Sequence, residues 1–157
     1  MKRVFWIVLV LALALCVFAG CGSTEEKSDV KLADVLAKIN KTYPDAVKGL
    51  TELEKASDLT RYYEIDEDEI DDFAAEINTD SSKAALEIVI VKTKNIDDVK
   101  QKLNIRYQAI LSQYASYSAD QLKMAKEGGV NTTGDYVYLV VAEDSKGIMD
   151  IIEKEIG

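Results

Sequence analysis

The chain has 157 residues, with 19 basic and 28 acidic side chains, no histidine and a formal charge of −9. The absence of histidine excludes Ser-His-Asp and Cys-His nucleophilic catalysis and the metal sites that use imidazole ligands. The excess of negative charge argues against nucleic acid as a partner, because nucleic-acid binding draws most of its affinity from neutralised phosphates.

The first 20 residues have the three-part layout of a secretory signal. Lys2 and Arg3 form a positive start, an apolar run follows, and small residues precede Cys21. The 16 residues from Val4 to Ala19 are fewer than the roughly 20 that a transmembrane helix needs. We therefore predict a helical signal peptide over residues 1–20 that is cleaved. The alternative is an uncleaved N-terminal anchor helix.

The segment Phe18-Ala19-Gly20-Cys21 resembles the bacterial lipobox, in which the cysteine receives a diacylglyceryl group. The resemblance implies that Cys21 is lipidated and holds the protein at the outer face of the cytoplasmic membrane. Two acyl chains give a stable anchor, whereas one gives only reversible attachment. Residues 22–29 are polar, small and without periodicity, so residues 21–29 are expected to be a lipidated cysteine and a flexible tether.

Residues 30–157 are expected to form a single domain without cysteine chemistry. Cys16 lies in the removed signal and Cys21 becomes a thioether, so we expect no disulfide partner and no cysteine metal site. We also expect no cofactor. Residues 21–157 lack Lys2 and Arg3 and so carry 17 basic and 28 acidic side chains, a formal charge of −11. Anionic lipids attract basic segments, so the anchor alone is expected to keep this domain at the membrane.

Two helical stretches are predicted ahead of an acidic run. Apolar residues at helical spacing indicate a first helix over residues 30–43, which Pro44 ends. A less regular pattern indicates a second helical stretch over residues 46–63, with Gly49 weakening its start.

Residues 64–72 are the most acidic run of the chain. An EF-hand counted from Asp66 would need an oxygen ligand at Ile70, a glycine at Asp71 and a glutamate at Ile77, so three of its requirements fail. Asp66 and Glu69 have the spacing of a capping box, which we favour. A cation site in this run remains the alternative.

The rest of the chain alternates hairpins and helices. The expected strands cover residues 74–78, 85–92, 130–133 and 136–142, and the expected helices cover residues 95–117, 118–126 and 145–156. This order predicts an α+β fold: a mainly antiparallel sheet of about four strands in two hairpins, with helices packed on one face, preceded by the signal helix.

Four segments together resemble the DUF4358 family of Firmicutes lipoproteins. They are Tyr63-Glu64-Ile65-Asp66, Ala85-Leu86-Glu87-Ile88, Tyr114-Ala115-Ser116-Tyr117 and Gly134-Asp135-Tyr136-Val137-Tyr138-Leu139-Val140-Val141. The resemblance spans roughly residues 30 to 156. It implies a surface lipoprotein and supplies no catalytic residues.

Tyrosines are the remaining candidates for a binding site, since one end of this side chain is apolar and the other forms hydrogen bonds. We predict that a groove, if present, lies where Tyr62, Tyr63, Tyr114 and Tyr117 converge. The alternative is that tyrosines such as Tyr107, Tyr114, Tyr136 and Tyr138 pack helix on sheet with their hydroxyls at the rim.

Three functions from different classes remain open. The preferred one is a non-enzymatic binding module outside the membrane, serving another envelope protein or a wall polymer. The second is an envelope enzyme that uses paired carboxylates. The third is a substrate-capture lipoprotein for a transporter, which generally needs two lobes, whereas this chain has length for one.

Overall fold

The computed structural model describes residues 30–80 and 84–157. The predicted signal helix, Cys21 and the tether lie outside these residues. Within the described residues, no helix combines the length and the apolar character needed to cross a membrane. The helices are α2 (Leu32–Thr42), α3 (Ala56–Tyr63), α4 (Ile96–Tyr117), α5 (Ala119–Glu127) and α6 (Ser145–Ile156), with a 3-10 helix η1 (Glu67–Glu69). The strands are β1 (Thr51–Glu52), β2 (Asp72–Ile77), β3 (Glu87–Lys92), β4 (Gly129–Thr133) and β5 (Tyr136–Val141).

The strands form one antiparallel sheet in the order β1-β2-β3-β5-β4. Both predicted hairpins are present, as β2–β3 and β4–β5, and β3 pairs with β5 at the centre. The predicted α+β class with a mainly antiparallel sheet is confirmed. The sheet has five strands rather than about four, because β1 adds a short edge strand beside β2.

The second helical stretch, predicted over residues 46–63, is wrong in its first half. Gly49 has a φ of 84°, a left-handed conformation that favours glycine and interrupts a right-handed helix. The chain then pairs as β1, and helix α3 begins only at Ala56. Leu53 and Leu59 are both buried. Their spacing suggested one helix, but they belong to two different elements.

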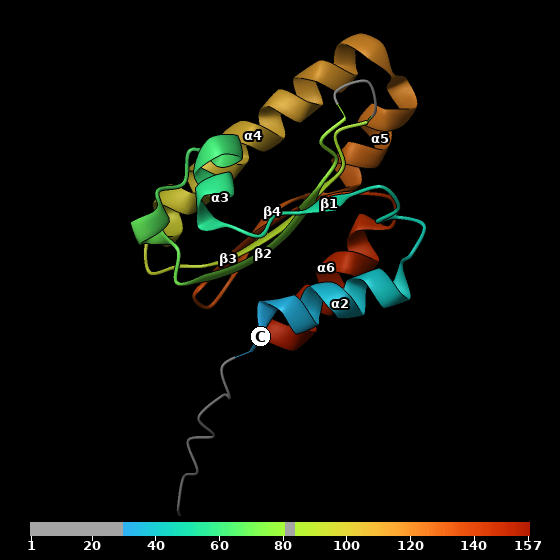
Figure 1. Cartoon of the computed structure of the whole chain (residues 1–157). Helices are drawn as coiled ribbons and strands as arrows, with labels where there is room; N and C mark the ends of the chain where they lie inside the picture. The colour runs from blue at the N-terminus through green and yellow to red at the C-terminus, as the bar shows by residue number, and fades with distance from the viewer. Residues whose placement is uncertain (1–29, 81–83) are drawn as a thin grey trace, which may run out of the picture.

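Helices cover both faces of the sheet, which corrects the prediction that they pack on one face (Figure 1). Alternate residues of a strand point to opposite sides. Val89 and Val91 of β3 therefore pack with α3, α4 and α5, whereas Ile88 and Ile90 pack with α2 and α6. A sheet that is apolar on both faces needs a cover on each to exclude water. We call these covers the α3–α5 layer and the α2–α6 layer.

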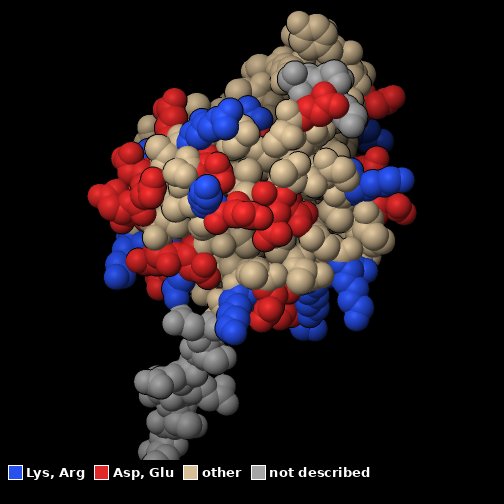
Figure 2. All heavy atoms as spheres, in the orientation of Figure 1, with Lys and Arg blue, Asp and Glu red and all other residues tan. Residues whose placement is uncertain are grey.

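Charged side chains of both signs are distributed over much of the surface seen in Figure 2. The upper end of that view, over the corner between α4 and α5, is mainly uncharged. The sequence agrees, because residues 107–119 contain no charged side chain.

One carboxylate lies under the α2–α6 layer. Glu76 of β2 is 7% exposed, and its Oε1 accepts a hydrogen bond from Asn40 Nδ2 of α2. Burial raises the pKa of Glu76 by more than the hydrogen bond from Asn40 lowers it, and the charge of Glu52, its neighbour across β1 and β2, makes a smaller raising contribution. The ionised form of Glu76 is therefore disfavoured in the folded protein.

We predict that Glu76→Gln stabilises the protein at pH 7. A raised folded-state pKa means that the contribution of Glu76 is most favourable below its unfolded pKa and is lost as the pH rises through its folded pKa. Glutamine keeps the acceptor for Asn40 without the charge, so we expect a gain on the order of 1 kcal/mol at pH 7, or a few degrees in the melting temperature.

Thermal unfolding at pH 7 and at pH 4 tests this prediction. The gain should shrink at pH 4, where Glu76 of the wild type is largely protonated. The control Glu52→Gln, at an exposed position, should give a smaller gain. An equal gain at both pH values would show that the charge of Glu76 is not the cause.

Candidate functional site

A carboxylate is buried at the start of β3, the middle strand of the sheet. Glu87 is only 1% exposed, and the next four residues of β3 are apolar. Strand alternation places Glu87 on the same face as Val89 and Val91, so its side chain points into the α3–α5 layer. A carboxylate is tolerated at such a position only when polar partners satisfy it.

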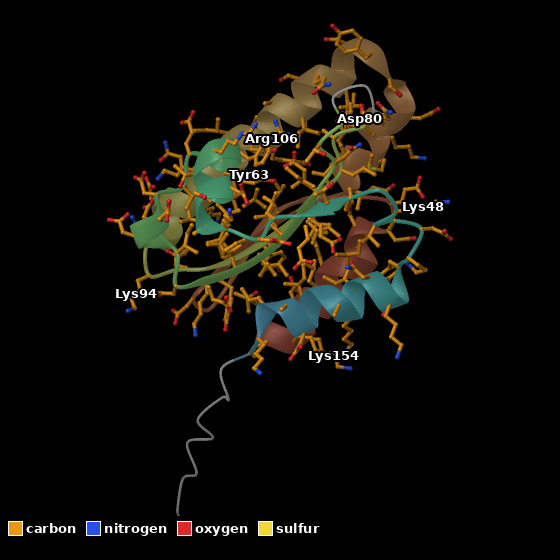
Figure 3. The ribbon with its side chains drawn as sticks, in the orientation of Figure 1. Lys48, Tyr63, Asp80, Lys94, Arg106 and Lys154 are labelled. Atoms are coloured by element: carbon orange, nitrogen blue, oxygen red, sulfur yellow. The ribbon has the colours of Figure 1, made fainter. Side chains whose placement is uncertain are left out.

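Arg106 of α4 and Tyr63 of α3, both labelled in Figure 3, each donate hydrogen bonds to the Glu87 carboxylate. The Nε of Arg106 donates to Glu87 Oε1 at 2.9 Å, and its Nη2 donates to the same oxygen. The hydroxyl of Tyr63 donates to Glu87 Oε2 at 3.0 Å. Burial and the adjacent carboxylate raise the pKa of Tyr63 well above its usual value, so Tyr63 stays a neutral donor. Together these contacts fasten α3 and α4 to β3.

A pocket of about 160 Å³ opens between α3 and α4 beside this cluster. Its lining consists of Tyr62, Tyr63 and Glu64 at the end of α3, and of Lys102, Ile105, Arg106 and Ala109 along one face of α4. Ile105 is 63% exposed, and among the described residues only Tyr117 is another exposed large apolar side chain. The pocket thus combines an aromatic and aliphatic wall with charged groups.

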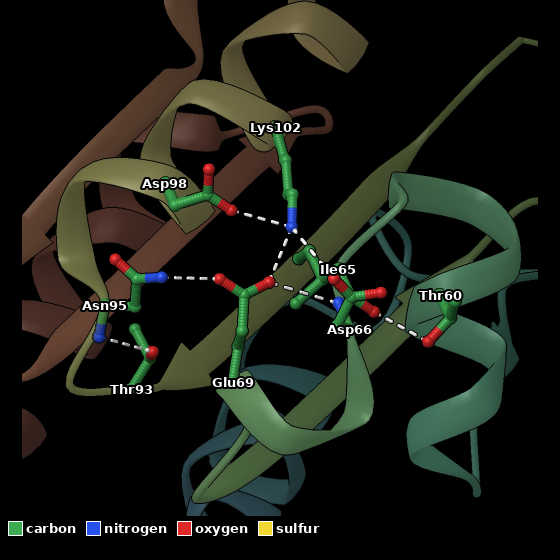
Figure 4. Close-up of polar contacts among 8 residues, drawn as sticks. All are labelled: Thr60, Ile65, Asp66, Glu69, Thr93, Asn95, Asp98 and Lys102. Atoms are coloured by element: carbon green, nitrogen blue, oxygen red, sulfur yellow. Dashed lines mark hydrogen bonds and ion pairs between the residues drawn. The ribbon is translucent and has the colours of Figure 1, made fainter.

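The ammonium of Lys102, at one end of the pocket, is surrounded by carboxylates (Figure 4). Its Nζ lies 2.5 Å from Glu69, 2.6 Å from Asp98 and 3.9 Å from Asp66. The hydrogen bonds to Asp98 and Glu69 raise the pKa of Lys102. This network joins η1 to α4 and leaves the lysine charge locally compensated.

The same view shows one hydrogen bond of the predicted capping box of the acidic run. The amide of Asp66 donates to Glu69 Oε2 at 3.2 Å, at the start of η1. Two carboxylates of the run therefore contact Lys102. In residues 30–80 and 84–157, no three acidic, histidine or cysteine side chains are grouped to hold a metal ion.

The four candidate tyrosines do not form one groove. Tyr62 and Tyr63 line the pocket. Tyr114 of α4, however, is buried in the α3–α5 layer, and Tyr117, at the end of α4, is 84% exposed. Tyr117 stands eleven residues beyond Arg106, about 16 Å along the helix. The packing role expected of the tyrosines is present, since Tyr114, Tyr136 and Tyr138 are buried and Tyr107 is partly buried. The hydroxyl of Tyr114, however, is buried and does not lie at the rim. A role of Tyr62 and Tyr63 in binding stays a prediction.

Sequence reasoning assigned no role to Glu87. The signal was a charged residue at an inward position of a strand that is apolar on both faces. Arg106 was missed because its partner is 19 residues away in the chain. Ile105 was missed because an exposed isoleucine becomes informative only when it stands at the rim of a pocket.

A pair of carboxylates of the kind used by glycoside hydrolases is not present at this pocket. Glu64 is the one carboxylate among its lining residues. Glu52 and Glu76 oppose each other across β1 and β2, but Glu76 is 7% exposed under α2 and neither residue lines the pocket. The pocket therefore lacks two acidic groups placed on either side of a substrate bond.

We predict that Arg106→Met destabilises the protein by about 2–3 kcal/mol, because it leaves the buried Glu87 with Tyr63 alone. The loss is expected to be smaller than the roughly 3–5 kcal/mol of a fully buried pair, since the Arg106 side chain is 35% exposed. The double variant Glu87→Leu/Arg106→Met should recover much of this loss, because it removes both charges.

Urea unfolding of the single and double variants measures these values. Lys38→Met, which breaks the ion pair between Lys38 and Glu155 at the surface, is the control and should cause a much smaller loss. If the double variant is as unstable as Arg106→Met, the unpaired Glu87 charge is not the source of the effect.

A known family model covers the part of the chain that contains this pocket. The family model described as "Domain of unknown function (DUF4358)" matches residues 45–142, about three-fifths of the chain. No curated protein and no solved structure matches the chain. The matched residues include all five strands, α3, α4 and α5, and every residue of the pocket, whereas α2 and α6 lie outside them. The chain belongs to the DUF4358 family.

Proposed function

We propose that this protein is a lipid-anchored binding module outside the cytoplasmic membrane, which holds its ligand in the pocket between α3 and α4. The pocket is the observation that carries the proposal. It combines the Tyr62 ring, the exposed Ile105 and a guanidinium fixed by a buried carboxylate. Small-molecule and peptide sites commonly combine an apolar wall with a few positioned polar groups in this way.

The position of the pocket supports the proposal. The described chain begins next to α2, which belongs to the α2–α6 layer, and the pocket belongs to the opposite α3–α5 layer (Figure 1). A lipid on Cys21 would therefore attach the domain from the side away from the pocket. The pocket would face outward, toward soluble ligands or other envelope components.

The chemistry of the lining favours binding over catalysis. Glu87 is saturated by Arg106 and Tyr63, and Lys102 is engaged by three carboxylates. Groups that are held in this way fix a geometry and are poorly suited to exchange protons with a substrate. A binding site needs only such fixed donors and a complementary wall.

The anchor is tested by two cysteine substitutions in the full chain, expressed in a bacterium that processes lipoproteins. Cys21→Ser removes the proposed lipid acceptor, so the protein should lose metabolic labelling by palmitate and leave the washed membrane fraction. Cys16→Ser changes a residue of the proposed signal and should leave both properties unchanged. Labelling that persists in Cys21→Ser would contradict the anchor.

The pocket is tested by a photo-crosslinking residue at position 105 on intact cells. We expect an adduct that Tyr62→Ala weakens several-fold, because this substitution removes one wall of the pocket. Tyr117→Ala is the matched control, since Tyr117 is an exposed tyrosine outside the pocket, and it should leave the adduct unchanged. If both variants affect the adduct equally, the pocket is not the site. Tyr63 is not a suitable target, because its hydroxyl is a partner of Glu87.

A further inference from the structure

The donors of Arg106 are only partly engaged. A guanidinium has five N–H donors on three nitrogens. The contacts of Arg106 use Nε and Nη2, both directed at Glu87 Oε1, and leave Nη1 without a partner among the described residues. The side chain is 35% exposed and lines the pocket. A cation with unused donors therefore borders the space between α3 and α4.

Burial of Glu87 fixes this cation in place. The carboxylate is 1% exposed, and both of its oxygens accept hydrogen bonds, from Arg106 and from Tyr63. The ion pair therefore has its negative end in the core and its positive end toward the pocket. A receptor whose orientation is set before binding loses little side-chain entropy when the ligand arrives.

Lys102 does not compete for the same role. Its ammonium is compensated by Glu69, Asp98 and Asp66, so it offers less attraction to a further anion than Arg106 does. The hydrogen bond to Glu87 raises the pKa of Arg106, which therefore stays charged at every physiological pH.

The residues that line the pocket determine which further group a ligand can carry beside an anionic group. Ile105 and Ala109 stand four residues apart on α4 and form an aliphatic wall next to Arg106, and Tyr62 faces them from α3. A pocket of about 160 Å³ is smaller than the roughly 300–1,000 Å³ of sites for drug-sized ligands. It suits one aliphatic side chain. The acidic domain also disfavours ligands that carry several negative charges.

We propose that the pocket binds a single carboxylate carried on a short branched aliphatic group, with the carboxylate on Nη1 of Arg106 and the aliphatic group against Ile105 and Ala109. Two sources present this chemistry: the C-terminal residue of a peptide, and a free aliphatic amino acid. The proposal rests on the binding function proposed above and adds the chemical class of the ligand.

The test is an NMR titration of the folded domain with N-acetyl-leucine and, in parallel, N-acetyl-leucinamide, which lacks the carboxylate. We expect saturable shifts of the Ile105 methyl and the Arg106 Nε–H signals with the acid, at a dissociation constant of about 1 mM or below, corresponding to roughly −4 kcal/mol. The amide should bind at least tenfold more weakly. Equal binding of acid and amide, or no saturable shift with the acid, would overturn the proposal.

Two matched variants place the ligand. Ile105→Asp puts a negative charge on the pocket wall and should weaken N-acetyl-leucine binding at least tenfold. Tyr117→Asp makes the same charge change at another exposed position of α4 and should alter the affinity less than twofold. Both positions are exposed, so both variants are expected to fold, which their thermal unfolding verifies. Equal affinities for the two variants would remove the pocket as the site.

Free leucine distinguishes the two sources. If leucine binds as tightly as N-acetyl-leucine, carboxylate recognition is supported and the ligand is a free amino acid. If only the acetylated acid binds, carboxylate recognition is also supported, and the ligand is the C-terminal residue of a peptide. The two proposals can also fail separately. If the position-105 adduct depends on Tyr62 but neither N-acetyl-leucine nor leucine binds, the proposal of a carboxylate ligand is overturned, whereas the proposal of a binding pocket stands.

Discussion

The α3–α5 layer depends on one ion pair, between the buried Glu87 and the partly exposed Arg106. Glu87 points from the middle strand into a layer of apolar side chains, where an uncompensated carboxylate would cost several kcal/mol. Arg106 and Tyr63 remove that cost, and each comes from a different helix. The positions of α3 and α4 relative to the sheet are therefore set by a directional contact, in addition to the non-directional burial of Leu59, Leu103 and Ile110.

The same contact determines the properties of the pocket. Since Glu87 uses both of its oxygens inside the protein, the pocket has a guanidinium at its wall and no accompanying acceptor from β3. The network around Lys102 ties η1 to the N-terminal half of α4 and keeps the near end of the pocket in place. Apolar packing stabilises this region, whereas the contacts of Glu87 and the contacts of Lys102 fix the positions of its helices.

Much of the fold could be predicted from local patterns. Period-two alternation predicted both hairpins, and period-3.6 spacing predicted α4 and α6, because these signals lie within single elements. The short strand β1 could not be predicted, since two residues carry no periodicity and their partners lie on β2. The distribution of helices over both faces was also missed. The apolar character of β5 on both sides showed that it is covered, but not which helices cover each side.

The site was less accessible to sequence reasoning. Of the four candidate tyrosines, Tyr62 is half-buried and Tyr63 is buried, and both line the pocket. Tyr114 and Tyr117 were grouped with them, yet Tyr114 faces the core, whereas Tyr117 is the last residue of α4 and faces water. Arg106 and Glu87 could be paired only once the helix and the strand were placed in space.

The start of α2 and the C-terminus lie close together in the α2–α6 layer (Figure 1). The domain can thus be held, extended or fused at either end through its base, while the face that carries the pocket is left unobstructed.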